Sequence, residues 1–250
     1  MSRPQRGPAL ADTSRTGAGI GLLAALLFLV AFLFFLTTSP TGSPGLPDVG
    51  DARFAPAYFA ENLDAVRIST LLTAVGVTLF LWFLAHLWAR LRPAEPAPGQ
   101  DSMVVLIGGV AGSVLVLAGL ALTATSGLST TTDQAVNVST LYVASALLTA
   151  LGGAVFSIFF FGVAKVILRT GAMARWLGWL AVLAALLCAC AVMTPFFTAN
   201  ILNAATGALG RWCWTAALFV WLLLASGAMA LGERRRAQAS SAAAGTPEVA

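Results

Sequence analysis

Twenty-six consecutive residues carry no charge: Val138-Ser-Thr-Leu-Tyr-Val-Ala-Ser-Ala-Leu-Leu-Thr-Ala-Leu-Gly-Gly-Ala-Val-Phe-Ser-Ile-Phe-Phe-Phe-Gly-Val163. An α-helix advances about 1.5 Å per residue, so crossing about 30 Å of hydrocarbon takes about 20 residues. This stretch is therefore long enough and apolar enough to span a membrane as a helix.

Five further segments meet the same standard of length and composition. They are Ala18 to Leu36, Ile68 to about Trp88, about Met103 to Leu122, Trp176 to Phe197, and Trp212 to Leu231. A cleaved signal peptide is the alternative for the first of them. Its apolar run is long for a signal peptide and no A-x-A-like cleavage site follows it, which favours a retained span.

The composition agrees with a chain whose solvent is mostly lipid. Of the 250 residues, 58% are hydrophobic and only 10% are charged, whereas charged residues approach a quarter of a soluble domain. The net charge of +4 comes from 14 basic residues scattered at the ends of the spans, so a nucleic-acid partner is not expected. The sequence predicts an all-α fold, a polytopic transmembrane helical bundle of six spans in a bacterial plasma membrane.

The basic residues also predict the orientation, because cytoplasmic connections carry an excess of Lys and Arg. Only Arg53, Arg67 and Arg211 fall on the outer side of the six-span arrangement. The other eleven fall on the inner side and are Arg3, Arg6, Arg15, Arg90, Arg92, Lys165, Arg169, Arg175, Arg234, Arg235 and Arg236. Both termini are therefore predicted to be cytoplasmic.

This topology divides the chain into three parts. Residues 1–17 form a cytoplasmic N-terminal segment, residues 18–232 form the six-span transmembrane domain, and residues 233–250 form a cytoplasmic tail. The tail is rich in Ala and Ser and low in complexity, so we expect it to be disordered. Within the transmembrane domain, residues of about 38–66 are predicted to form an extracytoplasmic loop and a surface helix.

The surface helix is predicted from spacing within residues 54–67. Phe59, Leu63 and Val66 recur at near-helical intervals, which is typical of an amphipathic helix lying on the outer membrane surface and leading into the second span.

The acidic residues of the same segment define the one candidate polar site. Glu61, Asp64 and Arg67 are spaced three apart, so on one helix they would share a face. Two interpretations stay open: a solvated face with a helix salt bridge, and a small outward-facing polar site at the mouth of the bundle.

The fourth span carries the clearest packing signal. Ser145, Thr149, Gly153 and Ser157 recur every four residues, forming a seam of small side chains that allows another helix to approach closely. Packing within one chain is favoured over a homo-oligomer interface or a pore lining. Shorter faces of the same kind occur in the first and third spans, at Gly17 and Gly21, and at Gly108 and Gly112.

No catalytic, cofactor-binding or metal-ligating constellation is predicted. His86 is the only histidine and falls at the inner membrane boundary, and Cys188, Cys190 and Cys213 lie in apolar runs as small hydrophobes. Lys165 follows the fourth span, where its ammonium group can reach the inner headgroups. No Asp, Glu, Lys or Arg falls in the middle of a span, whereas ion-coupled carriers usually bury one.

Two stretches resemble a family of actinobacterial six-span integral membrane proteins, a domain of unknown function. They are Leu79-Phe-Leu-Trp-Phe-Leu-Ala-His-Leu-Trp-Ala-Arg-Leu-Arg92 and Leu168-Arg-Thr-Gly-Ala-Met-Ala-Arg-Trp-Leu-Gly-Trp-Leu180. The second contains the recurrent feature of that family, a basic inner turn followed by a W-L-G-W start to the next span. The resemblance implies the six-span architecture and supplies no activity, ligand or functional residue.

Three functional hypotheses follow from these observations. The first is a non-enzymatic membrane protein that acts through helix packing, partners or lipids, the partners being the bilayer and a second copy or another membrane protein. The second is a permease or channel for a small uncharged or lipid-like solute. The third is a membrane enzyme acting on a lipid-borne substrate at the outer interface, for which Glu61, Asp64 and Arg67 are the only candidate residues.

Overall fold

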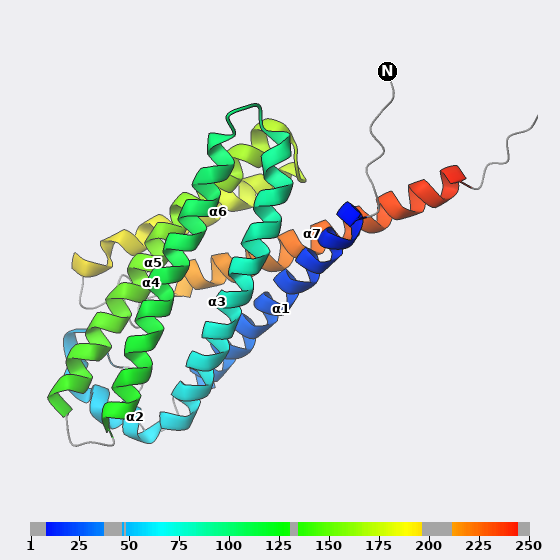
Figure 1. Cartoon of the computed structure of the whole chain (residues 1–250). Helices are drawn as coiled ribbons and strands as arrows, with labels where there is room; N and C mark the ends of the chain where they lie inside the picture. The colour runs from blue at the N-terminus through cyan, green and yellow to red at the C-terminus, as the bar shows by residue number, and fades with distance from the viewer. Residues whose placement is uncertain (1–8, 38–46, 48, 131–134, 197–211, 245–250) are drawn as a thin grey trace, which may run out of the picture.

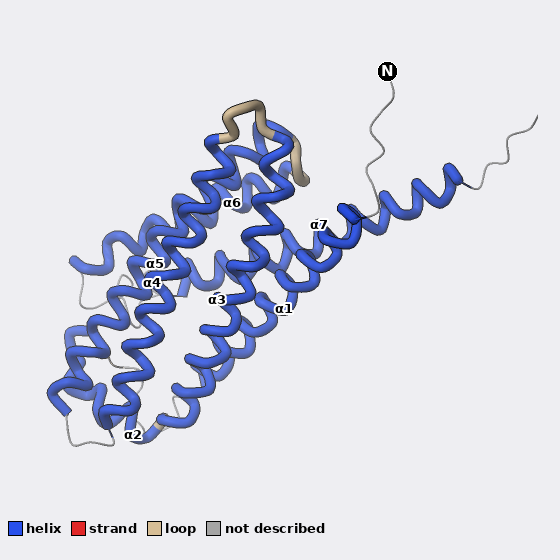
Figure 2. The backbone as a smooth tube through the Cα atoms, viewed as in Figure 1, coloured by secondary structure: helices blue, strands red, loops and turns tan. Residues whose placement is uncertain are grey.

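The computed structural model describes residues 9–37, 47, 49–130, 135–196 and 212–244, and in these ranges the only regular structure is helical (Figures 1 and 2). The α-helices are α1 (Ala9–Thr37), α2 (Ala55–Glu61), α3 (Leu63–Leu91), α4 (Gln100–Ser129), α5 (Ala135–Thr170), α6 (Arg175–Cys190) and α7 (Cys213–Ala244). Short 3-10 helices are η1 (Val49–Phe54), η2 (Arg92–Ala94) and η4 (Ala191–Phe196).

Every α-helix except α2 is long and apolar enough to cross a membrane, which gives six candidate spans among the described residues. Each coincides with one of the six segments expected from the sequence. The predicted fold class is confirmed: the chain is a polytopic α-helical integral membrane protein.

The six spans close into a ring. Each packs against the next in the chain, and α1 packs against both α3 and α7. Sequential spans are therefore neighbours, as is usual in helix bundles. At one end of the bundle the start of α1 and the latter part of α7 lie side by side, and α7 continues beyond the other helices (Figure 1). We call this the terminal end, and the opposite end, which carries α2, the loop end.

The closest contact in the ring joins α4 to α5. A Cβ atom on Gly108 would lie 2.6 Å from the backbone nitrogen of Phe159, and one on Gly152 would lie 3.0 Å from the carbonyl oxygen of Gly112. Because these neighbours are backbone atoms, no side-chain rotation could make room. Glycine is therefore what allows the two backbones to approach so closely.

The first span uses its glycines in the same way. A Cβ atom on Gly17 would lie 2.8 Å from the ring of His86 in α3, and one on Gly21 would lie 2.1 Å from Oγ of Ser226 in α7. The two glycines let α1 pack against both of its neighbours.

An aromatic cluster fills the centre of the bundle. The ring of Phe80 lies edge-on to Phe156 and Phe159, each with a centroid separation of 5.6 Å, and Phe159 makes a similar contact with Trp221 at 5.7 Å. Trp221 is fully buried, and its Nε1–H donates a hydrogen bond of 3.2 Å to the carbonyl of Leu177 in α6. This bond satisfies the only polar group of the cluster.

The predicted surface helix differs from the structure. The helix breaks at Asn62 (φ −116°, ψ 21°), which separates the seven-residue α2 from α3. Phe59 is buried against Tyr58 and against Tyr142 of α5, whose hydroxyl donates a hydrogen bond to the carbonyl of Pro47. The apolar face of α2 therefore covers protein at the loop end, because aromatic side chains of α5 offer it a surface to pack against.

Two helix ends also differ from the sequence expectation. The α-helix of the fifth span ends at Cys190 and continues as η4, which contains Pro195. Proline lacks a backbone N–H and disfavours the α conformation of the residue before it. In the tail, α7 extends to Ala244, so residues 233–244 are helical where disorder was expected. Alanine has the highest helix propensity and lets a preceding helix propagate.

The α4–α5 contact can be tested with a matched pair of glycine substitutions. Gly108→Ala should lower the Tm of the detergent-solubilised protein, since overpacking a close contact costs about 1–3 kcal/mol. Gly19→Ala is the control, because a Cβ atom there meets nothing within 4 Å. It should be neutral or raise the Tm, since alanine favours helix by about 1 kcal/mol over glycine. Equal effects at the two positions would contradict the close approach.

Candidate ligand-binding cavity

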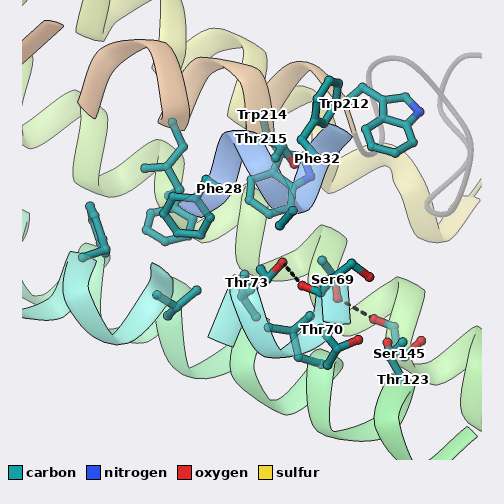
Figure 3. A pocket seen from close by; sticks show the side chains of 18 of the residues that line it. Phe28, Phe32, Ser69, Thr70, Thr73, Thr123, Ser145, Trp212, Trp214 and Thr215 are labelled. Atoms are coloured by element: carbon teal, nitrogen blue, oxygen red, sulfur yellow. Dashed lines mark hydrogen bonds between the residues drawn. The ribbon is translucent and has the colours of Figure 1, made fainter. Parts of the chain in front are cut away.

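A cavity of about 100 Å³ lies among α1, α3, α4, α5 and α7 toward the loop end (Figure 3). A water molecule needs about 10–15 Å³ of such space, so the cavity has room for a small organic molecule. Along α3 its lining runs from Ser69 to Phe80, which is about 16 Å of helix. The cavity therefore reaches from near the loop end to the middle of the bundle.

One wall of the cavity is aromatic. In Figure 3, Phe28 and Phe32 of α1, Trp212 just before α7 and Trp214 in its first turn lie on one side. The rings of Phe32 and Trp212 meet edge to face with centroids 5.3 Å apart. Trp214 is 4% exposed, and its Nε1 is buried without a hydrogen-bond partner.

The opposite wall carries hydroxyl groups. The hydroxyl residues of the lining are Ser69, Thr70, Thr73, Thr123, Ser145, Thr149 and Thr215, and all but Thr215 come from α3, α4 and α5. Figure 3 shows Ser69, Thr70, Thr73, Thr123 and Ser145 facing the aromatic rings. The cavity is thus apolar on one side and polar on the other.

Five of these hydroxyls donate to a carbonyl three or four residues earlier in their own helix. The bonds run from Ser69 to Val66, Thr73 to Ser69, Thr123 to Gly119, Ser145 to Tyr142 and Thr149 to Ser145, with lengths of 2.7 to 3.1 Å. This is how Ser and Thr satisfy their proton in an apolar helix. A hydroxyl oxygen can still accept, so the lone pairs remain available to a ligand.

Aromatic side chains close the inner end of the cavity. Phe80 and Phe156 line it, and beyond them Phe159 and Trp221 continue the central cluster. Further along α3 toward the terminal end, Leu84 and Leu87 are fully buried. The cavity therefore ends in the middle of the bundle.

The seam predicted in the fourth span contributes directly to this site. Ser145 and Thr149 line the cavity, and a Cβ atom on Gly153 would lie 2.5 Å from the indole of Trp214. The indole therefore rests against α5 where Gly153 has no side chain, and it stacks on Phe156 at an interplanar angle of 17°. Ser157, one turn further, is half-buried and does not line the cavity.

The candidate outer residues lie elsewhere. Asp64 and Arg67, both on α3, are 3.8 Å apart, with side chains 92% and 50% exposed. Glu61 is exposed at the end of α2, on the other side of the break at Asn62. None of the three lines the cavity, and the break removes the continuous helix on which they would share a face.

Sequence reasoning missed two features of the site and its surroundings. It did not single out Ser69, Thr73 and Thr123, whose hydroxyls resemble any others in an apolar span. It also missed an ion pair at the terminal end, where Lys165 Nζ lies 2.6 Å from Asp101 Oδ1 and Arg169 lies 3.8 Å from the other carboxylate oxygen. The position of Asp101 before one span and Lys165 after the next was a usable signal.

No charged side chain lines the cavity in the part of the chain that the structure describes. In those same ranges no group of three or more His, Cys, Asp or Glu residues is placed to hold a metal ion. The cavity can therefore offer hydroxyl oxygens, aromatic surfaces, the unpartnered Nε1–H of Trp214 and shape.

Comparison of the chain with protein-family models, with curated proteins and with solved structures gave no match.

Gly153→Ile should lower the Tm clearly, because the branched side chain would displace the indole of Trp214. Ala154, the next residue, is 7% exposed and is therefore no neutral control. Ala85, exposed on α3, serves instead. A comparable loss of Tm in Ala85→Ile would show that the effect reflects the helix propensity of isoleucine and not the contact with Trp214.

Proposed function

We propose that this protein is a non-enzymatic integral membrane protein that binds a small uncharged or lipid-like molecule in the cavity at its loop end. The observation that carries the proposal is the cavity itself, with one aromatic wall, one hydroxyl wall and no charged side chain in its lining. Ligand sites of this kind combine an apolar surface with a few polar groups that fix orientation.

The lining favours uncharged ligands on energetic grounds. An ion placed among aromatic rings and hydroxyls would lose its hydration without gaining an opposite charge, which costs several kcal/mol. An uncharged molecule with an apolar body loses little hydration and buries its body against Phe28 and Phe32. A molecule that partitions into the bilayer would meet these requirements.

A permease is the second candidate, and the depth of the cavity favours it. The cavity reaches the middle of the bundle, where the sites of many transporters lie. Transport would require Phe80 and Phe156 to separate from Phe159, since these rings close the route toward the terminal end. An enzyme is less supported, because the exposed pair of Asp64 and Arg67 does not line this cavity.

We also propose that the protein lies in a bacterial plasma membrane with both termini in the cytoplasm. The topology expected from the sequence, with eleven basic residues on the inner side against three on the outer side, supports this orientation. The loop end, and with it the cavity, would then face outward. Membership of the actinobacterial six-span family is part of the same proposal, supported by the two stretches that resemble it and by six candidate spans.

The orientation can be measured by labelling single cysteines in a background without Cys188, Cys190 and Cys213. Ala57 and Ala60 are exposed at the loop end, and Ala94 and Ala174 are exposed at the terminal end. A membrane-impermeant maleimide should label Ala57→Cys and Ala60→Cys in intact cells. It should label Ala94→Cys and Ala174→Cys only after permeabilisation. The reverse pattern would place both termini outside.

Ligand binding can be tested with benzyl alcohol and benzylammonium, which have similar shapes and differ in charge. Benzyl alcohol should raise the Tm of the purified protein more than benzylammonium does. Ala31→Phe should abolish this protection, because Ala31 lines the cavity and is 4% exposed.

Two further variants make that result interpretable. Ala85→Phe, exposed on α3, should keep the response of the unmodified protein. Ala146→Leu fills the cavity from α5 and replaces Ala31→Phe if that variant does not fold. The proposal fails if benzyl alcohol acts equally on the open and the filled protein.

A further inference from the structure

The hydrogen-bonding state of the cavity specifies its ligand more closely than the lack of charge does. Ser69, Thr73, Thr123, Ser145 and Thr149 come from three helices, and each donates its hydroxyl proton to its own helix. Each hydroxyl oxygen therefore faces its surroundings as an acceptor. From these five residues the cavity presents acceptors on its polar wall.

We infer that the ligand carries a hydrogen-bond donor, and that its chemical class is an uncharged alcohol with an apolar body. This inference rests on the proposed function, since it names the ligand class of the same cavity. The hydroxyl of the ligand meets the polar wall, and its apolar body lies against the aromatic wall.

An alcohol fits better than the other donor classes. A primary ammonium group also donates, but no carboxylate lines the cavity to compensate its charge. A carboxylic acid would be ionised at neutral pH, and no basic side chain lines the cavity to compensate its charge. An alcohol is neutral at all physiological pH values and can donate to one oxygen while accepting from another group.

An acceptor-only ligand would bind less well, because it can accept from the unpartnered Nε1–H of Trp214 but forms no added bond with the five hydroxyls, whose protons are already donated. To donate to such a ligand, Thr73 would have to release its 2.7 Å bond to the carbonyl of Ser69. Thr73 would give up one hydrogen bond to form another, and the carbonyl of Ser69 already takes part in the helix. The number of hydrogen bonds would therefore not increase. An alcohol adds a hydrogen bond without breaking one, and a neutral hydrogen bond is worth about 0.5–1.5 kcal/mol, or about two- to twelvefold in affinity.

The discriminating probes are benzyl alcohol and its isomer anisole, which have the same atoms and similar volume. Benzyl alcohol can donate a hydrogen bond, whereas anisole can only accept one. We expect benzyl alcohol to bind the purified full chain about fivefold more tightly than anisole, measured by titrating each isomer against the Tm.

The residues responsible are tested with a double substitution, at Thr73 on α3 and Thr123 on α4, and with a control substitution on α3. Thr73→Val and Thr123→Val together remove two acceptor oxygens from the cavity at nearly constant volume. The ratio of the affinity for benzyl alcohol to the affinity for anisole should then fall toward one. Thr78→Val is the control, because Thr78 makes the same bond to the carbonyl four residues earlier, at 2.9 Å, but is exposed outside the cavity. It should keep the full preference.

The outcomes separate this inference from the proposed function. Equal binding of the two isomers, with both lost in Ala31→Phe, would overturn the alcohol and leave the cavity as a binding site. A preference that survives in the Thr73→Val and Thr123→Val protein would also overturn it. Protection by Na⁺ or K⁺ in place of the alcohol would show that the hydroxyl oxygens bind a cation. If Ala31→Phe weakens the binding of neither isomer, the proposed function itself is overturned.

Discussion

The approach of α4 to α5 at backbone contact is the constraint on which the rest of the bundle depends. Between transmembrane helices the hydrophobic effect contributes little, because lipid tails are as apolar as the side chains. Association therefore rests on close packing, which Gly108, Gly112 and Gly152 make possible by exposing the backbone. With α4 packed on one side of α5, the other sides of α5 contact α6, α2 and the start of α7. This makes α5 the most buried of the six spans.

Adjacent glycines on α5 give the helix two separate docking surfaces. Gly152 meets α4, and Gly153, about 100° further round the helix, meets the indole of Trp214. The contact between Gly153 and Trp214 sets the position of the aromatic wall of the cavity. Thr149 and Ser145, one and two turns earlier in α5, supply part of the hydroxyl wall. The cavity is therefore a consequence of how α5 is packed.

The sequence was enough to predict the six spans, because apolar length is a local property that each segment carries by itself. It was enough to locate a small-residue seam on the fourth span, but not to say what the seam would touch. Gly152 and Gly153 are alike in sequence and differ only in which neighbour each one meets. Thr73 and Thr78 pose the same difficulty, since one lines the cavity and the other is exposed.

The prediction of a surface helix at the loop end was wrong for a related reason. Spacing alone predicted that Phe59 would face lipid, whereas its partner Tyr142 lies more than 80 residues away in the chain. An amphipathic segment buries its apolar face against whatever surface is nearest, and only the tertiary structure shows whether that surface is lipid or protein. The polar site predicted on Glu61, Asp64 and Arg67 assumed one continuous helix, and the break at Asn62 removes that assumption.

The two ends of the bundle handle polar groups in opposite ways, and the difference bears on function. At the terminal end the charge of Asp101 is compensated by Lys165 and Arg169, and removing Asp101 would leave both cations without this counterion. At the loop end each of five hydroxyls is already satisfied within its own helix. A cavity lined in this way needs no ligand to neutralise it, so a molecule can enter and leave without exposing an unpaired charge. Hydroxyl groups therefore offer polar contacts in the membrane interior that a ligand can make and break without leaving a charge unpaired. This property suits a site that binds and releases an uncharged ligand.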